Sequence, residues 1–186
     1  KALALKWDDD PPAVVVTSDL LGFSPSMTES LVAWASETHG LPRSRLILNA
    51  SHNHSGPVVE DVLPLYFALS DEHAAKSGAY TLFLEASLKD LINKALGNLV
   101  PATLGRGCAM AGLAANRRHH REGCSHLPQV VDHEVPVLAI TSTKANKLMA
   151  VVSGYSCHAT CTDDGTIHGD YPGYAQAKIE EAHQSE

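Results

Sequence analysis

The sequence has few basic residues and no long hydrophobic run, and each scarcity excludes a class of protein. Fourteen Lys and Arg residues stand against 21 Asp and Glu residues, which gives a formal net charge of -7 at pH 7. Nucleic-acid binding relies on clustered basic side chains that neutralise phosphates, so we expect no nucleic-acid partner. No apolar run reaches the roughly 18 residues of a membrane-spanning helix, so membrane contact is expected to be peripheral at most.

Cysteines are also few, and their spacing does not say how they are used. Cys108, Cys124, Cys157 and Cys161 allow three pairings into two disulfides in an exported protein. The motif "CHATC" invites a zinc-knuckle interpretation, but Cys108 and Cys124 are too far apart to complete such a site. We therefore interpret the cysteines as structural residues.

The length and composition are sufficient for one globular domain. The chain has 186 residues, of which 44% are hydrophobic, enough to bury a core. Its first residues, "KALALKWDDD", show neither a signal-peptide cleavage pattern nor an initiator Met. We therefore expect a piece of a longer or processed chain, which leaves the compartment open.

Strand and helix patterns alternate along the first part of the chain. The run "AVVVTSDLL" predicts a buried strand over 13–18, with Asp19 at its carboxyl end. The stretch "SMTESLVAWASETHG" predicts an amphipathic helix that Ser26 caps and Gly40 ends. "RLILNA" predicts a second buried strand, and the strand, helix, strand order implies a parallel pair.

The second part predicts one long helix, further strands and a last helix. The long helix is expected over 71–96, capped by Ser70 and packed on the sheet. Strand-like runs follow in "PATLGRG", "VPVLAITS" and "KLMAVVSGYSCH", before a helix from about Pro172 to His183. We predict a single domain over 1–186, an α/β fold with a mixed, partly parallel sheet and helices packed on it.

The stretch "SHNHSGP" places His52 and His54 directly after a predicted strand. Residues i and i+2 of an extended strand point to the same side, so both imidazoles would share one face of the turn. Gly56 would help this turn by allowing a positive φ. The stretch has no Gly-x-Ser-x-Gly elbow, so a serine nucleophile is not expected.

Catalytic zinc usually takes three protein ligands and keeps one open position, so two histidines need a further partner. His158 is the candidate, because it ends another apolar run, "KLMAVVSGYSCH". His54 is open to three roles: a ligand, a hydrogen-bond donor to a ligand, or a substrate contact.

Two acidic residues are predicted to support the histidines. Asp19 follows a strand that runs parallel to the one before His52, and the carboxyl ends of parallel strands meet at one edge of a sheet. Asp170 precedes a helix, where it can cap the helix or accept a hydrogen bond from a ligating imidazole. Both interpretations of Asp170 stay open.

Several ordered motifs resemble those of the neutral/alkaline non-lysosomal ceramidases, in the amino-terminal part of their catalytic domain. "NASHNHSGP" is similar to the family's Thr-His-Thr-His-Ser-Gly-Pro signature, and "AANRR" to its Asn-Arg motif. "YSCHATCTDDGTIHGDYPGYA" is similar to its His-x-x-Ser and Ser-Gly-Asp-x-x-Gly-Tyr-Ala block. The resemblance implies that His52 and His158 bind Zn²⁺ and that His54 orients or polarises the substrate. It also implies that Arg117 and Asn116 bind the substrate's polar head.

By this resemblance the chain is part of a zinc-dependent amidase that cleaves ceramide-like lipids to a fatty acid and a sphingoid base. It also implies a secreted, periplasmic or cell-surface location. The chain departs from the family at His168 and Cys161, where serines are usual, and the family's other zinc ligands, a glutamate and a tyrosine, lie beyond its end. The apolar stretch "PVVEDVLPLYFALS" is expected to line the mouth of a lipid slot.

Other functions remain compatible with these residues. The same scaffold can serve a metal hydrolase of another amide or ester, or a non-catalytic metal-binding module. A pH response is a further hypothesis, since protonation of all eleven histidines would take the formal charge from -7 to +4. The oligomeric state is left open.

Overall fold

The computed structural model describes residues 1–119, 121–126, 128–162 and 164–183. The chain divides into two compact units, the first made of Lys1–Leu99 with the residues from Ala159 onward, and the second of Val100–His158. The predicted mixed α/β fold is confirmed, although its strands belong to two separate sheets. The single domain over 1–186 stays a prediction.

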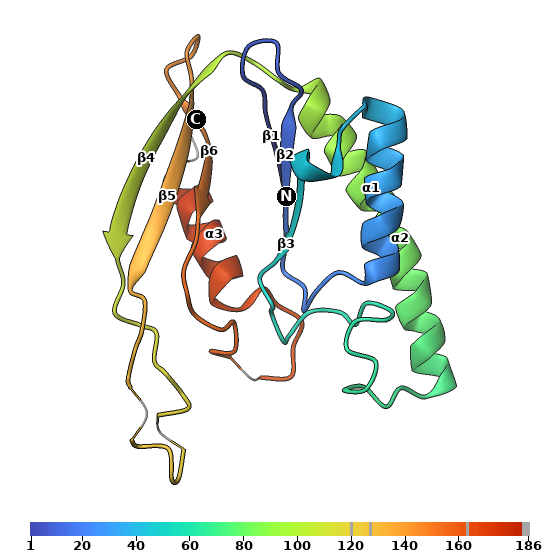
Figure 1. Ribbon diagram of the computed structural model, residues 1–186, viewed down its shortest axis with the longest axis vertical. Coiled ribbons are helices and arrows are strands. Elements are labelled where there is room, and N and C mark those ends of the chain that lie inside the picture. Colours follow the sequence, from blue (N-terminus) through green and yellow to red (C-terminus); the bar gives the residue numbers. More distant parts are fainter. Residues whose placement is uncertain (120, 127, 163, 184–186) are drawn as a thin grey trace. The chain divides into compact units, whose positions relative to one another are not determined.

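The first unit contains a mixed sheet in the order β1-β2-β3 (Figure 1). Its strands are β1 (Ala2–Leu5), β2 (Ala13–Ser18) and β3 (Leu46–Ala50). Strand β2 pairs parallel with β3, which confirms the predicted pair, while β1 pairs antiparallel with β2. Strand β1 was not predicted, because a four-residue run of Ala and Leu has little of the β-branched character that marks strands.

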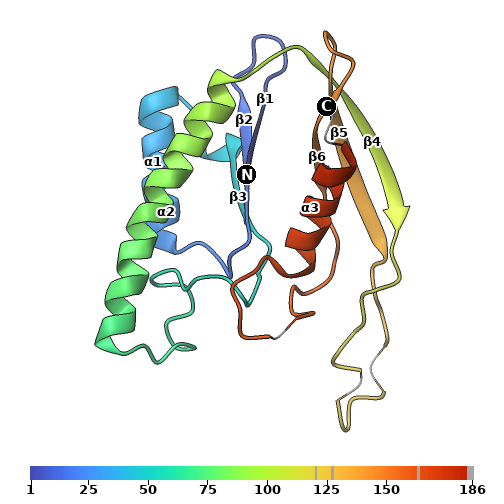
Figure 2. The same cartoon turned by 180° about the vertical axis from the view of Figure 1, so that it is seen from behind.

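Helices lie on both sides of this sheet. Helices α1 (Pro25–His39) and α2 (Asp71–Gly97) lie on one side and α3 (Asp170–His183) on the other (Figures 1 and 2). A short 3₁₀ turn, Arg43–Arg45, leads into β3. The core comprises Val14, Val16, Leu20, Met27, Leu31, Ala35, Leu41, Leu46, Val59, Leu84, Leu88 and Ile92.

The start of α1 differs from the prediction. Ser24, not Ser26, is the N-cap, and its hydroxyl accepts a hydrogen bond of 3.3 Å from the backbone N–H of Met27. Pro25 occupies the first helical position, where its missing N–H costs nothing and its fixed φ suits the helix. The predicted stop is confirmed, since Gly40 adopts a left-handed φ of 61°.

The other helix ends agree with the sequence to within two residues. Ser70 caps α2 as predicted, with its hydroxyl 3.3 Å from the N–H of His73. Helix α2 includes Gly97, one residue past the predicted end, and α3 begins at Asp170 instead of near Pro172. None of the described helices is both long and apolar enough to cross a membrane.

The second unit is an antiparallel sheet in the order β4-β5-β6. Its strands are β4 (Ala102–Met110), β5 (Glu134–Ser142) and β6 (Leu148–Ser153), in the three predicted regions. The Tyr155 hydroxyl holds the segment after β4, because it donates to the carbonyl of Ala111 at 2.6 Å and accepts from the N–H of Ala114 at 2.7 Å. Cys108, Cys124, Cys157 and Cys161 are not joined by disulfide bonds in the structure, so the disulfide pairings that the sequence allows are not formed here.

Candidate metal centre

Three imidazoles form a compact cluster. One ring nitrogen from each of His52, His54 and His158 lies within 4.8 Å of the others. The rings of His52 and His54 meet edge to face, with centroids 5.1 Å apart and planes at 87°. His158 immediately precedes Ala159, a fully buried residue at which the chain re-enters the first unit. The sequence therefore identified all three members of the cluster.

The backbone that brings His52 and His54 together is a turn, not an extended strand end. Strand β3 ends at Ala50, and His52 has a left-handed φ of 57°. A positive φ is uncommon outside glycine and is worth about 1–3 kcal/mol of strain when the surroundings impose it. The alternation of strand residues was therefore the wrong physical reason for a correct pairing. Gly56 likewise has no positive φ, contrary to expectation.

The hydrogen bonding of His52 defines which nitrogen can bind a metal. Its Nδ1 lies 2.8 Å from the backbone carbonyl oxygen of Leu21. A carbonyl oxygen only accepts, so Nδ1 carries the proton and Nε2 carries the lone pair in the neutral ring. Ligating histidines commonly show this arrangement, in which a backbone carbonyl fixes the tautomer. Three neutral imidazoles are also a donor set that zinc accepts, so the residues fit the expected ion.

Asp19 lies at the end of β2, next to the histidine turn, as predicted. Its carboxylate accepts a hydrogen bond of 3.4 Å from Nε2 of Gln176 on α3. The contact with the start of α3 is close, since a Cβ atom on Gly169 would lie 2.9 Å from Oδ2 of Asp19. Asp19 therefore anchors α3 against the sheet, and its predicted hydrogen bond to an imidazole stays a prediction.

Asp170 is 1% exposed and has a positive φ of 51°. Its carboxylate accepts from the N–H of Tyr171 at 2.6 Å, and from the N–H groups of Thr162 and Cys161, both at 3.0 Å. Burial raises the pKa of Asp170, but these hydrogen bonds and one from the Thr162 hydroxyl outweigh it, so the pKa lies below its usual value. Asp170 thus ties the segment that follows His158 to the start of α3. Its bond to a ligating imidazole stays a prediction.

His168, which replaces the family's serine, takes part in the same network. Its Nδ1 accepts a hydrogen bond of 3.0 Å from the N–H of Asp170. The backbone N–H of His168 donates to the carbonyl of Ser55 at 3.1 Å, which joins the loop before α3 to the histidine turn. His168 is therefore part of the structure that holds the turn, and no metal role follows from it.

Asn53, between the two histidines, is a residue that sequence reasoning missed. It is fully buried. Its Nδ2 donates to the carbonyls of Asp19 at 3.4 Å and His168 at 2.5 Å, and its Oδ1 accepts from the N–H of Ser55 at 2.9 Å. The available signal was its residue type, because Asn side chains in turns commonly form hydrogen bonds to nearby backbone groups.

A small apolar cavity lies beside His54. Its volume is about 110 Å³. It is lined by Leu21, Asn53, His54, Gly56, Pro57, Val58, Val59, Val62 and Phe67. Part of the apolar stretch after the histidine turn therefore faces a cavity, and its role at the mouth of a lipid slot stays a prediction. Leu65 does not, since its side chain is fully exposed at 103%.

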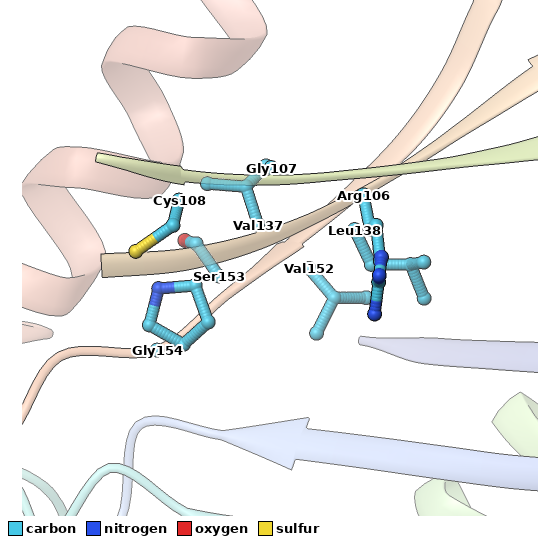
Figure 3. Close-up of a pocket in the computed structure, with 9 residues that line it drawn as sticks. Arg106, Gly107, Cys108, Val137, Leu138, Val152, Ser153 and Gly154 are labelled. Atoms are coloured by element: carbon cyan, nitrogen blue, oxygen red, sulfur yellow. The ribbon is translucent and has the colours of Figure 1, made fainter. Parts of the chain in front are cut away.

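A larger groove of about 690 Å³ lies on the β4-β5-β6 sheet of the second unit (Figure 3). Arg106 brings a positive charge to this groove and Cys108 a thiol. The other lining residues are Gly107, Pro136, Val137, Leu138, Val152, Ser153 and Gly154. Among these nine residues there is no imidazole or carboxylate, so Cys108 is the one lining residue of a type that binds metals or transfers protons, and a single thiol does not make a site.

The predicted substrate-binding residues lie in the loop between β4 and β5. The side chain of Asn116 shapes this loop, since its Oδ1 accepts from the N–H of Arg118 at 3.2 Å and its Nδ2 donates to the carbonyl of Pro128 at 3.4 Å. Arg117 is exposed. Contact of either residue with a substrate stays a prediction.

The fold is a mixed α/β architecture with a three-histidine cluster, in which His52 and His54 follow the parallel strand β3 and His158 follows β6. No protein-family model matches the sequence, and the search of curated proteins found no match. Among solved structures, neutral ceramidase from Pseudomonas aeruginosa matches 96% of this chain with a TM-score of 0.74 and 18% identity. A ceramidase complexed with C2 matches 95% with a TM-score of 0.73 and 19% identity.

The resemblance to ceramidases is therefore confirmed at the level of the fold. The chain spans 29% and 28% of the length of these two structures, so it corresponds to a fragment of a larger chain. This agrees with the expectation that the sequence is a piece of a longer chain, and its place in the amino-terminal part of a catalytic domain stays a prediction.

Proposed function

We propose that this chain is part of a zinc-dependent amidase that hydrolyses the N-acyl amide bond of ceramide-like lipids. The observation that carries the proposal is the cluster of His52, His54 and His158, with ligand atoms within 4.8 Å. It occurs on a fold that aligns with neutral ceramidase over 96% of this chain. The structural similarity to ceramidases supports the substrate class, and the histidine cluster supports the metal site.

In this proposal His52 and His158 hold the ion. A bound zinc supplies Lewis acidity, which polarises a carbonyl group and makes water a stronger acid. The hydrogen bond from His52 to the Leu21 carbonyl holds its ring in the tautomer that presents Nε2. His54 orients the amide carbonyl of the substrate, since it lines the apolar cavity as well as belonging to the cluster.

The polar head of the substrate is assigned to Arg117 and Asn116. A guanidinium is a rigid fork of donors that suits a carbonyl or hydroxyl-rich group, and the exposed position of Arg117 leaves it accessible. The apolar cavity beside His54 takes the part of the lipid next to the amide. The sphingoid base and the fatty acid are the expected products.

The test is hydrolysis of ceramide by the natural full-length protein, with release of fatty acid and sphingoid base measured by mass spectrometry. His52→Ala and His158→Ala are expected to abolish turnover, while His73→Ala, an exposed residue of α2, leaves it unchanged. Full turnover in either cluster variant contradicts the proposal. Stoichiometric metal without turnover on any amide or ester would instead identify a non-catalytic metal-binding module.

The size of the cavity favours a second candidate, a metal hydrolase of short amides or esters. Its volume of about 110 Å³ is below the roughly 300–1,000 Å³ typical of pockets for drug-sized ligands. Turnover of ceramide and of short-chain acyl amides and esters, compared at equal enzyme concentration, separates the two. Higher kcat/KM on the short substrates would favour the second candidate.

We also propose a secreted, periplasmic or cell-surface location, in line with the motif resemblance. Detection of the natural protein in the medium or surface fraction, by immunoblotting beside a cytosolic marker, would support it. Recovery only with the marker would contradict it.

A further inference from the structure

The side chain of Asn53 joins three segments of the first unit. Its Nδ2 donates to the carbonyl of Asp19, at the end of β2, and to the carbonyl of His168, just before α3. Its Oδ1 accepts from the N–H of Ser55 within the histidine turn, and its own N–H donates to the carbonyl of Leu20 at 3.2 Å. The turn that carries both histidines is thus tied to two other parts of the unit.

Only a primary amide of this length satisfies all these partners. Two of them are carbonyl oxygens, which require two donor hydrogens, and the third is an N–H, which requires an acceptor. Aspartate would place oxygens against the carbonyls of Asp19 and His168. Serine offers one donor, and leucine has the shape but no polar atom. Because Asn53 is fully buried, water does not replace the lost partners.

The residue before Asn53 adopts an unfavourable backbone conformation. His52 has a φ of 57°, which persists only where the surrounding structure imposes it. Asn53 is the next residue, and its hydrogen bonds fix the position of the peptide that follows His52. His54 directly follows Asn53, so the hydrogen bonds of this one buried side chain restrict the backbone of both His52 and His54.

We infer that Asn53 is a positioning residue, whose side-chain amide holds His52 in the geometry that binds the metal and keeps His54 beside it. This inference rests on the metal site of the proposed function. It adds a residue that is not itself a metal ligand and that acts through the backbone of the turn. Loss of its hydrogen bonds would allow His52 to relax from its left-handed conformation and move its imidazole away from the cluster.

The test is titration of the metal-free, natural full-length protein with Co²⁺, followed by visible absorption. Asn53→Leu is expected to weaken Co²⁺ binding about 10- to 100-fold, the usual effect of losing support around a metal ligand, and to alter the absorption bands. Asn53→Ser, which keeps one donor, is expected to give an intermediate affinity. This milder variant decides the question if Asn53→Leu does not fold.

The control is Ile92→Ala, which removes buried volume from α2 without removing a hydrogen bond. It is expected to lower the free energy of unfolding while leaving Co²⁺ affinity and spectrum unchanged. Wild-type affinity and spectrum in Asn53→Ser and in any folded Asn53→Leu would overturn the inference and leave the metal site standing. Failure of the wild type to bind Co²⁺ would instead overturn the metal site on which the inference rests.

Discussion

Gly56 packs directly against the backbone carbonyl of Asp19, so closely that a Cβ atom on Gly56 would lie 2.8 Å from that oxygen. The space between the histidine turn and the end of β2 therefore admits only glycine. Gly56→Ala is expected to lower the free energy of unfolding by about 1–3 kcal/mol through overpacking.

Equilibrium urea unfolding measures this effect. The matched control is Gly97→Ala at the end of α2, where an added Cβ meets nothing within 4 Å and alanine suits the helix. The control is expected to be neutral or stabilising. Equal stability of Gly56→Ala and wild type would contradict the close contact.

The N-cap of α1 provides a second prediction. Ser24→Ala removes the acceptor for the Met27 N–H and is expected to cost about 1 kcal/mol, within the usual range for caps. Ser26→Ala is the control and is expected to cost less, because Ser26 is exposed and lies within the helix. Thermal unfolding of the two variants compares them, and a larger loss in Ser26→Ala would restore the cap predicted from the sequence.

Asp170 predicts a pH-dependent contribution to stability. Its pKa is lower in the folded protein than in the unfolded chain, where an aspartate has a value of about 3.9. Its stabilisation is therefore complete above that value and is lost as the pH falls through the lower, folded-state pKa.

Asp170→Asn is the corresponding variant. The wild type is expected to be more stable than the variant at pH 7, and the difference in free energy of unfolding is expected to shrink below about pH 4. Urea unfolding at several pH values measures it. A difference that stays constant with pH would show that the charge of Asp170 does not contribute.

The cluster predicts distinct results for its three histidines. In the proposed assignment, His52→Ala and His158→Ala lose the metal, whereas His54→Ala keeps most of it and loses turnover. Inductively coupled plasma mass spectrometry of the purified full-length protein measures the metal content. Loss of metal in His54→Ala would make His54 a third ligand, one of the roles that the sequence left open.

Two apolar residues of the loop after the histidine turn, Phe67 and Leu65, are expected to differ in their effect on substrate binding. Phe67 lines the cavity beside His54, while Leu65 is fully exposed. Phe67→Asp is expected to raise KM for a lipid substrate, because it places a charge in an apolar cavity, and Leu65→Asp to change KM little. The reverse order would mean that the lipid contacts the outer surface of the loop.

Much of the fold follows from local patterns. The β-branched run of β2, the apolar spacing of α2 and the caps at Ser70 and Gly40 act within a few residues, so the sequence predicts them. Strand β1 did not follow, because its Ala and Leu residues become a strand only through pairing with β2. Local patterns also could not predict that the strands belong to two sheets, because strand pairing joins residues that are distant in the sequence.

The sequence by itself determined which imidazoles belong to the candidate metal site, because His52, His54 and His158 stand beside strand patterns and within ordered motifs. Only the tertiary structure decided how they are held. The left-handed turn at His52, the amide of Asn53 and the space beside Gly56 all depend on partners distant in the sequence. Such contacts are made by groups with no periodic pattern, so their roles appear only when the chain is folded.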